Sequence, residues 1–289
     1  MLKLYRSRPL SQLKTTCRPG GPEFLRRFVQ QLAFERRVGT PANDRAREMI
    51  CDKFRQIFGQ NAVIAGENQN VVMGDPNTAE ILIGAHYDSV PGTPGADDNA
   101  SAVAVMMWVA QCVRDLNKIC YVAFNSEEVG LAGSTEFVAT LSTRQSLKQV
   151  HILEMVGYRS RLPNSQRNPL GPLVVDMPTV GDFIGIVSNQ QHLVEQAIER
   201  AGMIDVPVIG TTLPPGVSLD MIGQMAGHLL RSDHAPFWEK NIPAVMWTDT
   251  AEFRNDNYHR PTDTPQTLDY EFMAAVAEVL IEISTNSCK

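Results

Sequence analysis

Strand-length apolar runs alternate with helix-length segments along this chain, and that alternation limits the folds open to it. The run 81–86 is apolar and bounded, as a strand buried on both faces would be. A helix is expected from about 99 to 116, followed by another strand at 119–124. Strands that alternate with helices predict an α/β fold. We therefore expect a three-layer sandwich, in which a mixed sheet with a mainly parallel centre is flanked by helices.

The remaining segments extend the same alternation. Further helices are expected over 21–38, 41–59, 131–141, 190–202, 233–240 and 267–284, and further strands at 63–64, 71–73, 150–156, 183–187, 206–210 and 243–248. The proline-containing stretches 158–182 and 211–231 are expected to be irregular. No linker divides the chain. We expect one domain over 21–289, preceded by an N-terminal extension over 1–20 that need not be ordered.

Composition excludes several classes of partner. The formal net charge is −6 and there is no basic run, which argues against binding to nucleic acid or to an anionic membrane. No segment approaches the roughly 20 apolar residues of a membrane span. No signal peptide follows Met1, so a cytoplasmic protein is expected, with export left open if a leader is missing. The five cysteines are odd in number and scattered, which favours free thiols.

Polar, ligand-bearing segments follow several of the expected strands. They contain two histidines and several carboxylates, in the segments 86–89, 95–101, 125–131, 154–158 and 257–261. In an open α/β sheet the ligand site lies beyond the carboxyl ends of the strands, where these segments fall. Histidine and carboxylate side chains are ligands that Zn²⁺ accepts, and this set suffices for a pair of ions.

His86 and Asp88 stand two residues apart at the end of an extended strand, so their side chains face the same way. If His86 binds a metal, Asp88 can accept the other ring N–H and fix the tautomer. The alternative is a pair that only closes the strand.

Asp97 and Asp98 lie in a loop that opens the helix expected from Asn99. One of these side chains could simply be a helix N-cap. Two adjacent acids directed into a cleft repel each other unless a cation offsets the repulsion. A carboxylate that bridges two metal ions would resolve that cost.

Glu127 and Glu128 follow the strand at 119–124 and point in different directions, because they are adjacent. A division of roles is natural, in which one binds metal and the other acts as general base. The alternative is a solvated acidic turn. Glu154 needs a partner if its strand is buried. His259 alone would more often be an ordinary surface or core histidine, but its place in the series of acids and histidines favours a ligand.

The segment Ser232-Asp233-His234 contains a serine, an acid and a base, but three consecutive residues cannot form a nucleophilic relay. The chain also lacks a Gly-x-Ser-x-Gly elbow. This segment is expected to support the metal site or to begin a helix.

At these positions the chain resembles the family 28 metallopeptidases, which include zinc aminopeptidases, glutamate carboxypeptidases and, as relatives, glutaminyl cyclases. The resemblance covers about residues 35 to 275. It extends to 232–237, 242–244 and 262–265. It implies the zinc exopeptidase fold.

The resemblance also implies a role for each matching residue. One zinc site would consist of His86, Asp97 and Glu154, and the other of Asp97, Glu128 and His259. Asp97 would then be the bridging ligand, followed by a cis peptide to Asp98. Glu127 would be the general base and acid, and Asp88 would orient His86. Glu154 departs from the family pattern, in which many aminopeptidases have Asp at this position.

The function expected from the resemblance is a zinc-dependent aminopeptidase with a peptide substrate and two ions. Three alternatives stay open: a glutaminyl-cyclase-like transferase with one zinc, a carboxypeptidase-type enzyme, and a non-catalytic binding protein. The walls of the substrate pocket are expected from the two irregular stretches and from Phe253, Arg254 and Tyr258. Side-chain preference and oligomeric state stay open.

Overall fold

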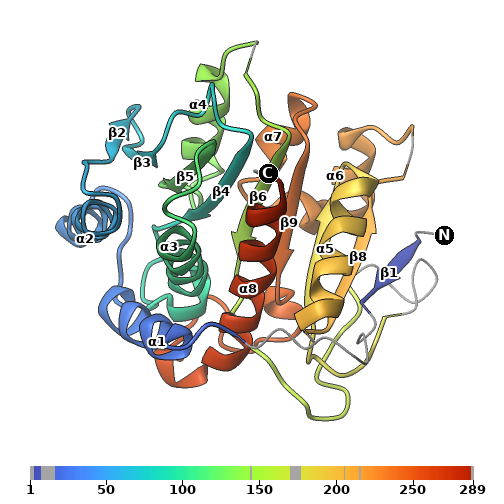
Figure 1. The fold of residues 1–289 in the computed structure, drawn as a ribbon. Helices are drawn as coiled ribbons and strands as arrows, with labels where there is room; N and C mark the ends of the chain where they lie inside the picture. Colours follow the sequence, from blue (N-terminus) through green and yellow to red (C-terminus); the bar gives the residue numbers. More distant parts are fainter. Residues whose placement is uncertain are drawn as a thin grey trace.

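The structure is a computed structural model that describes residues 3–7, 17–143, 145–169, 177–204, 206–214 and 216–287. Within these residues, nine strands form one sheet in the order β1-β8-β7-β9-β6-β4-β5-β3-β2 (Figure 1). The strands are β1 (Leu4–Arg6), β2 (Val63–Ala65), β3 (Asn70–Met73), β4 (Ile81–His86), β5 (Ile119–Phe124), β6 (Gln149–Glu154), β7 (Ile184–Ser188), β8 (Val208–Thr212) and β9 (Ala244–Thr248).

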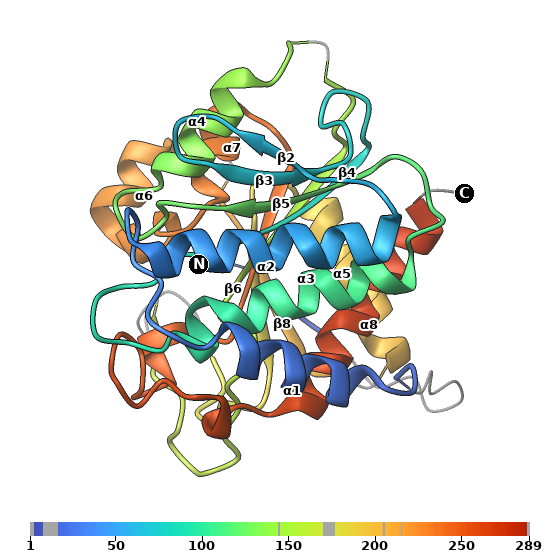
Figure 2. The ribbon, with the colours of Figure 1, turned by 90° about the vertical axis from the view of Figure 1, so that its left-hand side faces the viewer.

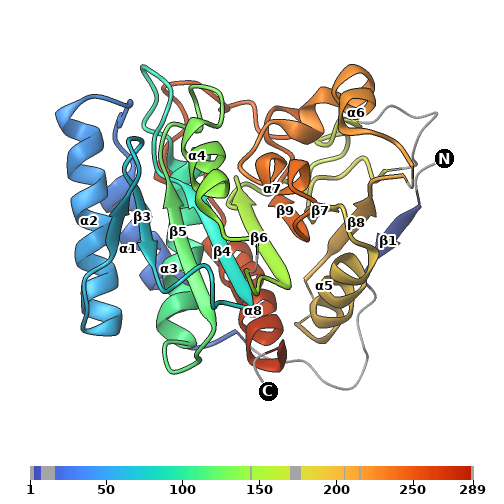
Figure 3. The ribbon, with the colours of Figure 1, turned by 90° about the horizontal axis from the view of Figure 1, so that it is seen from above.

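Helices cover both faces of this sheet, so the predicted α/β sandwich is confirmed (Figures 1 and 3). One face packs against α1 (Gly21–Leu32), α2 (Pro41–Phe58), α3 (Ala102–Cys112), α5 (Gln191–Ile204) and α8 (Tyr270–Ser287). The other face packs against α4 (Ala132–Thr140), α6 (Leu219–Ala226), η2 (Gly227–Leu230) and α7 (Ala235–Glu239). Figure 2 shows α1, α2 and α3 lying across the first of these faces. Short helical turns complete the chain at η1 (Ala96–Ser101), η3 (Ala251–Phe253) and η4 (Pro265–Thr267).

The centre of the sheet is parallel, and this sets the position of the site. β4 pairs in parallel with β5 and with β6, and β6 pairs in parallel with β9. The carboxyl ends of these four strands therefore meet at one edge. β4 and β5 are buried along their whole length, which explains why their sequences are apolar rather than alternating.

Several elements differ from the sequence prediction, among them the helix expected over 21–38, which ends as α1 at Leu32. The helix expected from about residue 99 begins as α3 at Ala102, because η1 bends there, with non-helical backbone at Asp98 and Asn99. The stretch 211–231 is not wholly irregular, since Ser218 caps α6 by accepting a hydrogen bond from the Met221 amide. β1 was not predicted, because three residues carry little periodic signal.

The N-terminal extension predicted over 1–20 lies partly outside the described residues. Of the described part, Leu4–Arg6 form β1 and the chain at Arg18 binds Glu278 through its backbone amide. The four described cysteines are free thiols, and Cys288 lies outside the described residues. Among the described residues, no helix combines the length and the apolar composition that a membrane crossing needs.

Candidate metal centre

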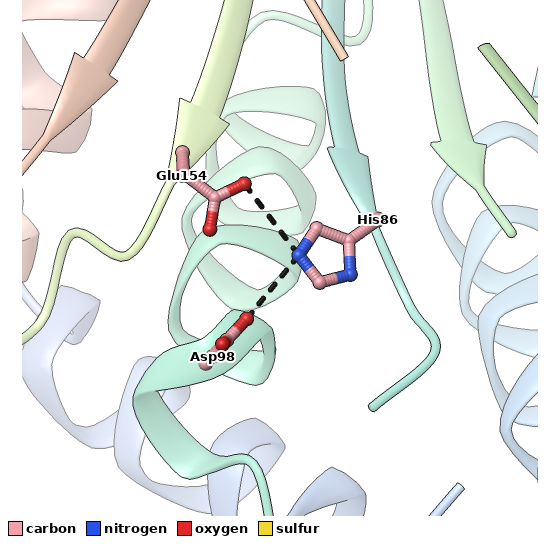
Figure 4. A group of neighbouring side chains, drawn as sticks. All are labelled: His86, Asp98 and Glu154. Carbon is pink, nitrogen blue, oxygen red and sulfur yellow. Dashed lines mark ion pairs between the residues drawn. The ribbon is translucent and has the colours of Figure 1, made fainter. Parts of the chain in front are cut away.

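The parallel strand ends bring His86 and Glu154 together with Asp98 (Figure 4). His86 closes β4 and Glu154 closes β6, while Asp98 approaches from η1. The Nε2 atom of His86 lies 3.3 Å from Asp98 Oδ1 and 3.5 Å from Glu154 Oε2. His86 is only 1% exposed. These three side chains therefore form a compact donor set that could hold a cation.

Asp98 also contacts a second histidine with its other carboxylate oxygen. Its Oδ2 atom lies 3.0 Å from His259 Nε2, and Glu128 Oε2 lies 3.4 Å from the same nitrogen. Asp98, Glu128 and His259 thus make a second group whose ligand atoms are within 4.8 Å of one another. A carboxylate that offers one oxygen to each group has the arrangement expected of a ligand that bridges two metal ions.

The structure contradicts the prediction that Asp97 is the bridging ligand. Its Oδ1 atom accepts a hydrogen bond from the Gly157 amide at 3.0 Å, and its Oδ2 accepts one from Asn255 Nδ2 at 2.7 Å. Asp97 is therefore directed away from the histidines, and it ties the loop to the segment after β6. The cis peptide is Asp98–Asn99, one residue beyond the predicted Asp97–Asp98. Both residues are acidic and lie in the same loop, so residue type alone does not distinguish them.

Asp88 connects the two halves of the site. Its Oδ1 atom lies 3.4 Å from His86 Nδ1, on the side of the ring opposite Asp98. The same carboxylate accepts hydrogen bonds from the backbone amides of Glu127 at 3.2 Å and Glu128 at 3.1 Å. Asp88 thereby sets the turn that presents both glutamates as well as facing the ring of His86.

Glu127 and Glu128 point in different directions, as their adjacency predicts. Glu128 contacts His259, whereas Glu127 Oε2 lies 3.9 Å from His86 Nε2. Glu127 is 9% exposed and lines the pocket described below. With His86 and Glu128 it forms a third group whose ligand atoms lie within 4.8 Å of one another. Glu127 is thus beside both metal groups and faces the cavity, a position that suits a side chain acting on a substrate or a water.

Three backbone positions beside these ligands adopt positive φ without being glycine. They are Ser126 at φ 65°, Met155 at 51° and His259 at 57°. Ser126 precedes Glu127, and Met155 follows Glu154. Such conformations cost free energy for residues with a side chain, and they cluster at functional sites whose surroundings enforce them.

The candidate metal centre contains more buried carboxylates than basic side chains to balance their charge. Burial, together with the charge of Asp98, raises the pKa of Glu128 to about 7. Burial lowers the pKa of His259, but its contacts with Asp98 and Glu128 outweigh this effect and bring that pKa to about 10. Burial likewise raises the pKa of Glu127. Buried carboxylates in excess over bases repel one another, and a bound cation offsets the repulsion.

Several buried polar atoms of the same residues lack a hydrogen-bond partner among the described residues. They are His86 Nδ1 and Nε2, Asp98 Oδ1 and Glu128 Oε1. Buried polar atoms are nearly always hydrogen-bonded, and an ion is one explanation for those that are not. Nitrogen and oxygen donors of this kind are suited to zinc. The residues present therefore fit a metal centre.

A buried arginine holds the loop that carries Asp98. Arg36 is fully buried, and its guanidinium donates to backbone carbonyls, among them Tyr87 O at 2.6 Å, Pro94 O at 2.7 Å and Gly95 O at 2.8 Å. Gly95 has φ 59°, and a Cβ atom there would lie 2.4 Å from Asp98 O. The loop that carries Asp98 is thus packed closely against the Arg36 guanidinium, which forms no ion pair with the candidate metal ligands.

Replacing Arg36 by Ala is expected to reduce the free energy of unfolding by at least about 3 kcal/mol, because several buried carbonyls lose their donor. The exposed neighbour Arg37 is the matched control, and its replacement by Ala should change stability by no more than about 0.5 kcal/mol. Urea unfolding followed by circular dichroism measures both. Equal stability of R36A and R37A would contradict this view of the loop.

The segment 232–234 contributes to the site without forming a nucleophilic relay. Ser232 Oγ donates to Glu154 Oε2 at 2.7 Å, so it orients the longer arm of that glutamate. Asp233 is buried, and His234 hydrogen-bonds through Nε2 to Leu229 O at 2.8 Å. Sequence reasoning also did not single out Asp263, whose carboxylate accepts from the amides of Asp97 and Asp98.

A cavity of about 110 Å³ opens from the candidate metal centre. Its lining includes Asp98, Glu127, Glu128 and Glu154 at the metal centre, and a larger apolar part over β7, β8 and β9. Phe253 and Tyr258 line it, as expected. Arg254 does not; it is buried and donates to Phe183 O at 2.7 Å, behind the wall.

Comparison with known proteins identifies the family. The family model "Peptidase family M28" matches residues 69–198 and 212–284, which is well over half of the chain. The uncharacterized protein YfbL of Escherichia coli (strain K12) is 32% identical over 96% of this chain and 92% of its own length. The chain therefore belongs to peptidase family M28, and the prediction of a hydrolytic metallopeptidase is confirmed at that level.

Solved structures show the same fold. The LapA aminopeptidase of Legionella pneumophila has a TM-score of 0.70 and 20% identity, over 92% of this chain and 72% of that one. The glutaminyl cyclase of Fimbriiglobus ruber has a TM-score of 0.65 and 18% identity, over 94% of this chain and 97% of that one. The fold is thus similar to that of two enzymes that catalyse different reactions. The fold alone does not decide between these reactions, which have to be distinguished by the residues of the site.

Proposed function

We propose that this chain is a zinc-dependent aminopeptidase with two metal ions. The observation that carries the proposal is the position of Asp98, which offers Oδ1 to His86 and Oδ2 to His259. One ion would be held by His86, Asp98 and Glu154, and the other by Asp98, Glu128 and His259. Each group supplies three protein ligands, which is the number that catalytic zinc sites use while leaving a position open.

Bound zinc would acidify a water molecule and polarise the scissile carbonyl. Glu127 then has the proton-transfer role: its carboxylate takes a proton from the attacking water and returns it to the leaving amine. Burial raises the pKa of Glu127, against the lowering effect of His86, and this helps the side chain to hold the proton between the two steps. Asp88 positions Glu127 through its backbone amide and faces the ring of His86.

The acidic end of the cavity supports recognition of a free amino terminus. Glu127 and Glu154 both line it, and a substrate's α-ammonium group would be attracted to their carboxylates. The first side chain of the peptide would then enter the apolar part of the cavity. An N-acetylated peptide offers no such cation, so it should be a poor substrate.

A second candidate function is cyclisation of N-terminal glutamine with loss of ammonia. The glutaminyl cyclase named above matches this chain over nearly the whole length of both proteins. Such an enzyme would use one zinc, held by Asp98, Glu128 and His259. The completeness of the group containing His86 and Glu154 favours the two-ion aminopeptidase.

Zinc titration separates the two candidates. Metal-free protein should recover activity with two equivalents of Zn²⁺ per chain, and excess zinc should raise the melting temperature by about 5–10 °C, since ligand at 100 times its Kd adds about 2.7 kcal/mol. Equilibrium dialysis with elemental analysis gives the stoichiometry. Saturation at one equivalent, with ammonia released from glutaminyl peptides, would favour the cyclase.

A further inference from the structure

The cavity extends well beyond the candidate metal centre. Its lining includes side chains from β9, β7, β8 and β1, in the order in which these strands lie in the sheet. Neighbouring strands are about 4.8 Å apart, so the three steps from β9 to β1 span about 14 Å. This distance across the sheet exceeds the length of any standard amino acid side chain.

The part of this cavity that lies away from the metal centre is mainly apolar. The side chains there include Met177, Phe183, Val187, Ile209, Leu229, Met246 and Phe253. Among the described lining residues outside the metal centre, the formally charged side chains are Arg231 and Glu252, and these form an ion pair with each other. The far part therefore has no unpaired charge to receive a charged substituent, and it suits a long hydrocarbon group.

The N-terminal strand supplies Leu4, the lining residue on the strand that lies furthest across the sheet from β9. Leu4 lines the cavity and pairs with Thr211 of β8, which also lines it, so both side chains stand on the same face of the sheet. Tyr5, the next residue, points to the opposite face and packs against the core beneath α5 and α8. In Figures 1 and 3, β1 lies at the edge of the sheet beside β8.

β1 is attached firmly enough to act as a wall. Besides the three paired positions in the ladder, the Ser7 amide donates to Val208 O at 3.0 Å. Ser7 Oγ accepts from the Val208 amide at 2.9 Å and donates to Val206 O at 3.0 Å. On the other side of Leu4, Thr211 Oγ1 donates to Lys3 O at 3.2 Å. The backbone is thus fixed on both sides of Leu4.

We propose that the cavity accepts an extended apolar side chain on the first residue of the substrate, and that Leu4 sets its length limit. This proposal rests on the proposed aminopeptidase function. Each added methylene gains apolar contact along the floor of the cavity until the chain meets Leu4. Leu4 is then a specificity-determining residue supplied by a strand that contributes nothing to the metal centre.

The test uses amino acid amides with straight alkyl side chains of two to ten carbons. For wild type, kcat/KM should rise with chain length and then fall. In L4A the fall should come at a greater length, with a gain of about tenfold for the first chain that wild type excludes. In L4W the fall should come at a shorter length, with short chains unaffected. Y5A is the matched control, because it alters the same strand on the opposite face and should keep the wild-type limit.

A second measurement makes the result independent of turnover. Amino alcohols with the same side chains keep the amine but lack the scissile bond, and calorimetry of zinc-loaded protein gives their Kd. A length limit in Kd that moves with L4A and L4W, without amide hydrolysis, would reject the aminopeptidase and retain the role of Leu4. Hydrolysis with one length limit in wild type, L4A and L4W would reject the role of Leu4 alone. A limit that moves equally in Y5A would also reject it.

Discussion

Replacing Glu127 by Gln is expected to lower kcat by about 10²–10⁴-fold, which is the usual contribution of a general acid–base group. Glutamine has nearly the same shape but cannot take the proton of the attacking water. Glu127 stands outside the two groups joined through Asp98, so the variant should keep its zinc. Steady-state hydrolysis of a chromogenic amino acid amide measures kcat, and elemental analysis measures the bound metal.

The control for this variant is E239Q, which alters an exposed glutamate at the end of α7. It should match wild type in kcat and in zinc content. Full activity of E127Q would remove Glu127 from the mechanism. If E127Q lost both its zinc and its activity, Glu127 would be a metal ligand. The group formed by His86, Glu127 and Glu128 would then be the metal site that contains it.

Replacing Asp98 by Asn should have the larger effect on metal binding. The bridging position requires two anionic oxygens, whereas an amide has one neutral carbonyl oxygen and, in place of the second oxygen, an NH₂ group that only donates. We expect D98N to lose at least one zinc per chain and to fall below about one hundredth of wild-type activity. D97N is the neighbouring comparison. Its amide still accepts from Gly157 or Asn255, so it should keep both ions, with metal affinity reduced by at most about 10–100-fold.

Gel filtration followed by elemental analysis gives zinc per chain for both variants. The reverse pattern, with D97N losing metal and D98N keeping it, would restore the ligand set expected from the sequence. Equal retention in both would mean that neither aspartate bridges.

The sequence predicts the location of those site residues that stand at the carboxyl ends of strands. His86 and Glu154 end apolar strands whose type is clear from composition, so their meeting at one edge follows from parallel pairing. The choice between Asp97 and Asp98 does not follow, because both are acidic residues of the same loop. The hydrogen bonds that direct the Asp97 carboxylate away from the histidines come from Gly157 and Asn255, far along the chain.

Other contributions are invisible in the sequence for similar reasons. Arg36 stands next to Arg37, and from the sequence both arginines would be expected on the solvent-exposed surface. Only the tertiary approach of the Pro94–Gly95 backbone buries the first and leaves the second exposed. β1 is too short to show a period, and its pairing with β8 places Leu4 in the lining of the cavity. Long-range packing overrides local pattern at each of these places.

The most direct test of the central claim is mass spectrometry of a peptide mixture incubated with zinc-loaded protein. The mixture holds each peptide in a free and an N-acetylated form, together with peptides that begin with glutamine. Stepwise loss of N-terminal residues from the free peptides, with the acetylated ones intact, is the predicted result. Loss of ammonia from the glutamine peptides without shortening, or an unchanged mixture, would contradict the aminopeptidase.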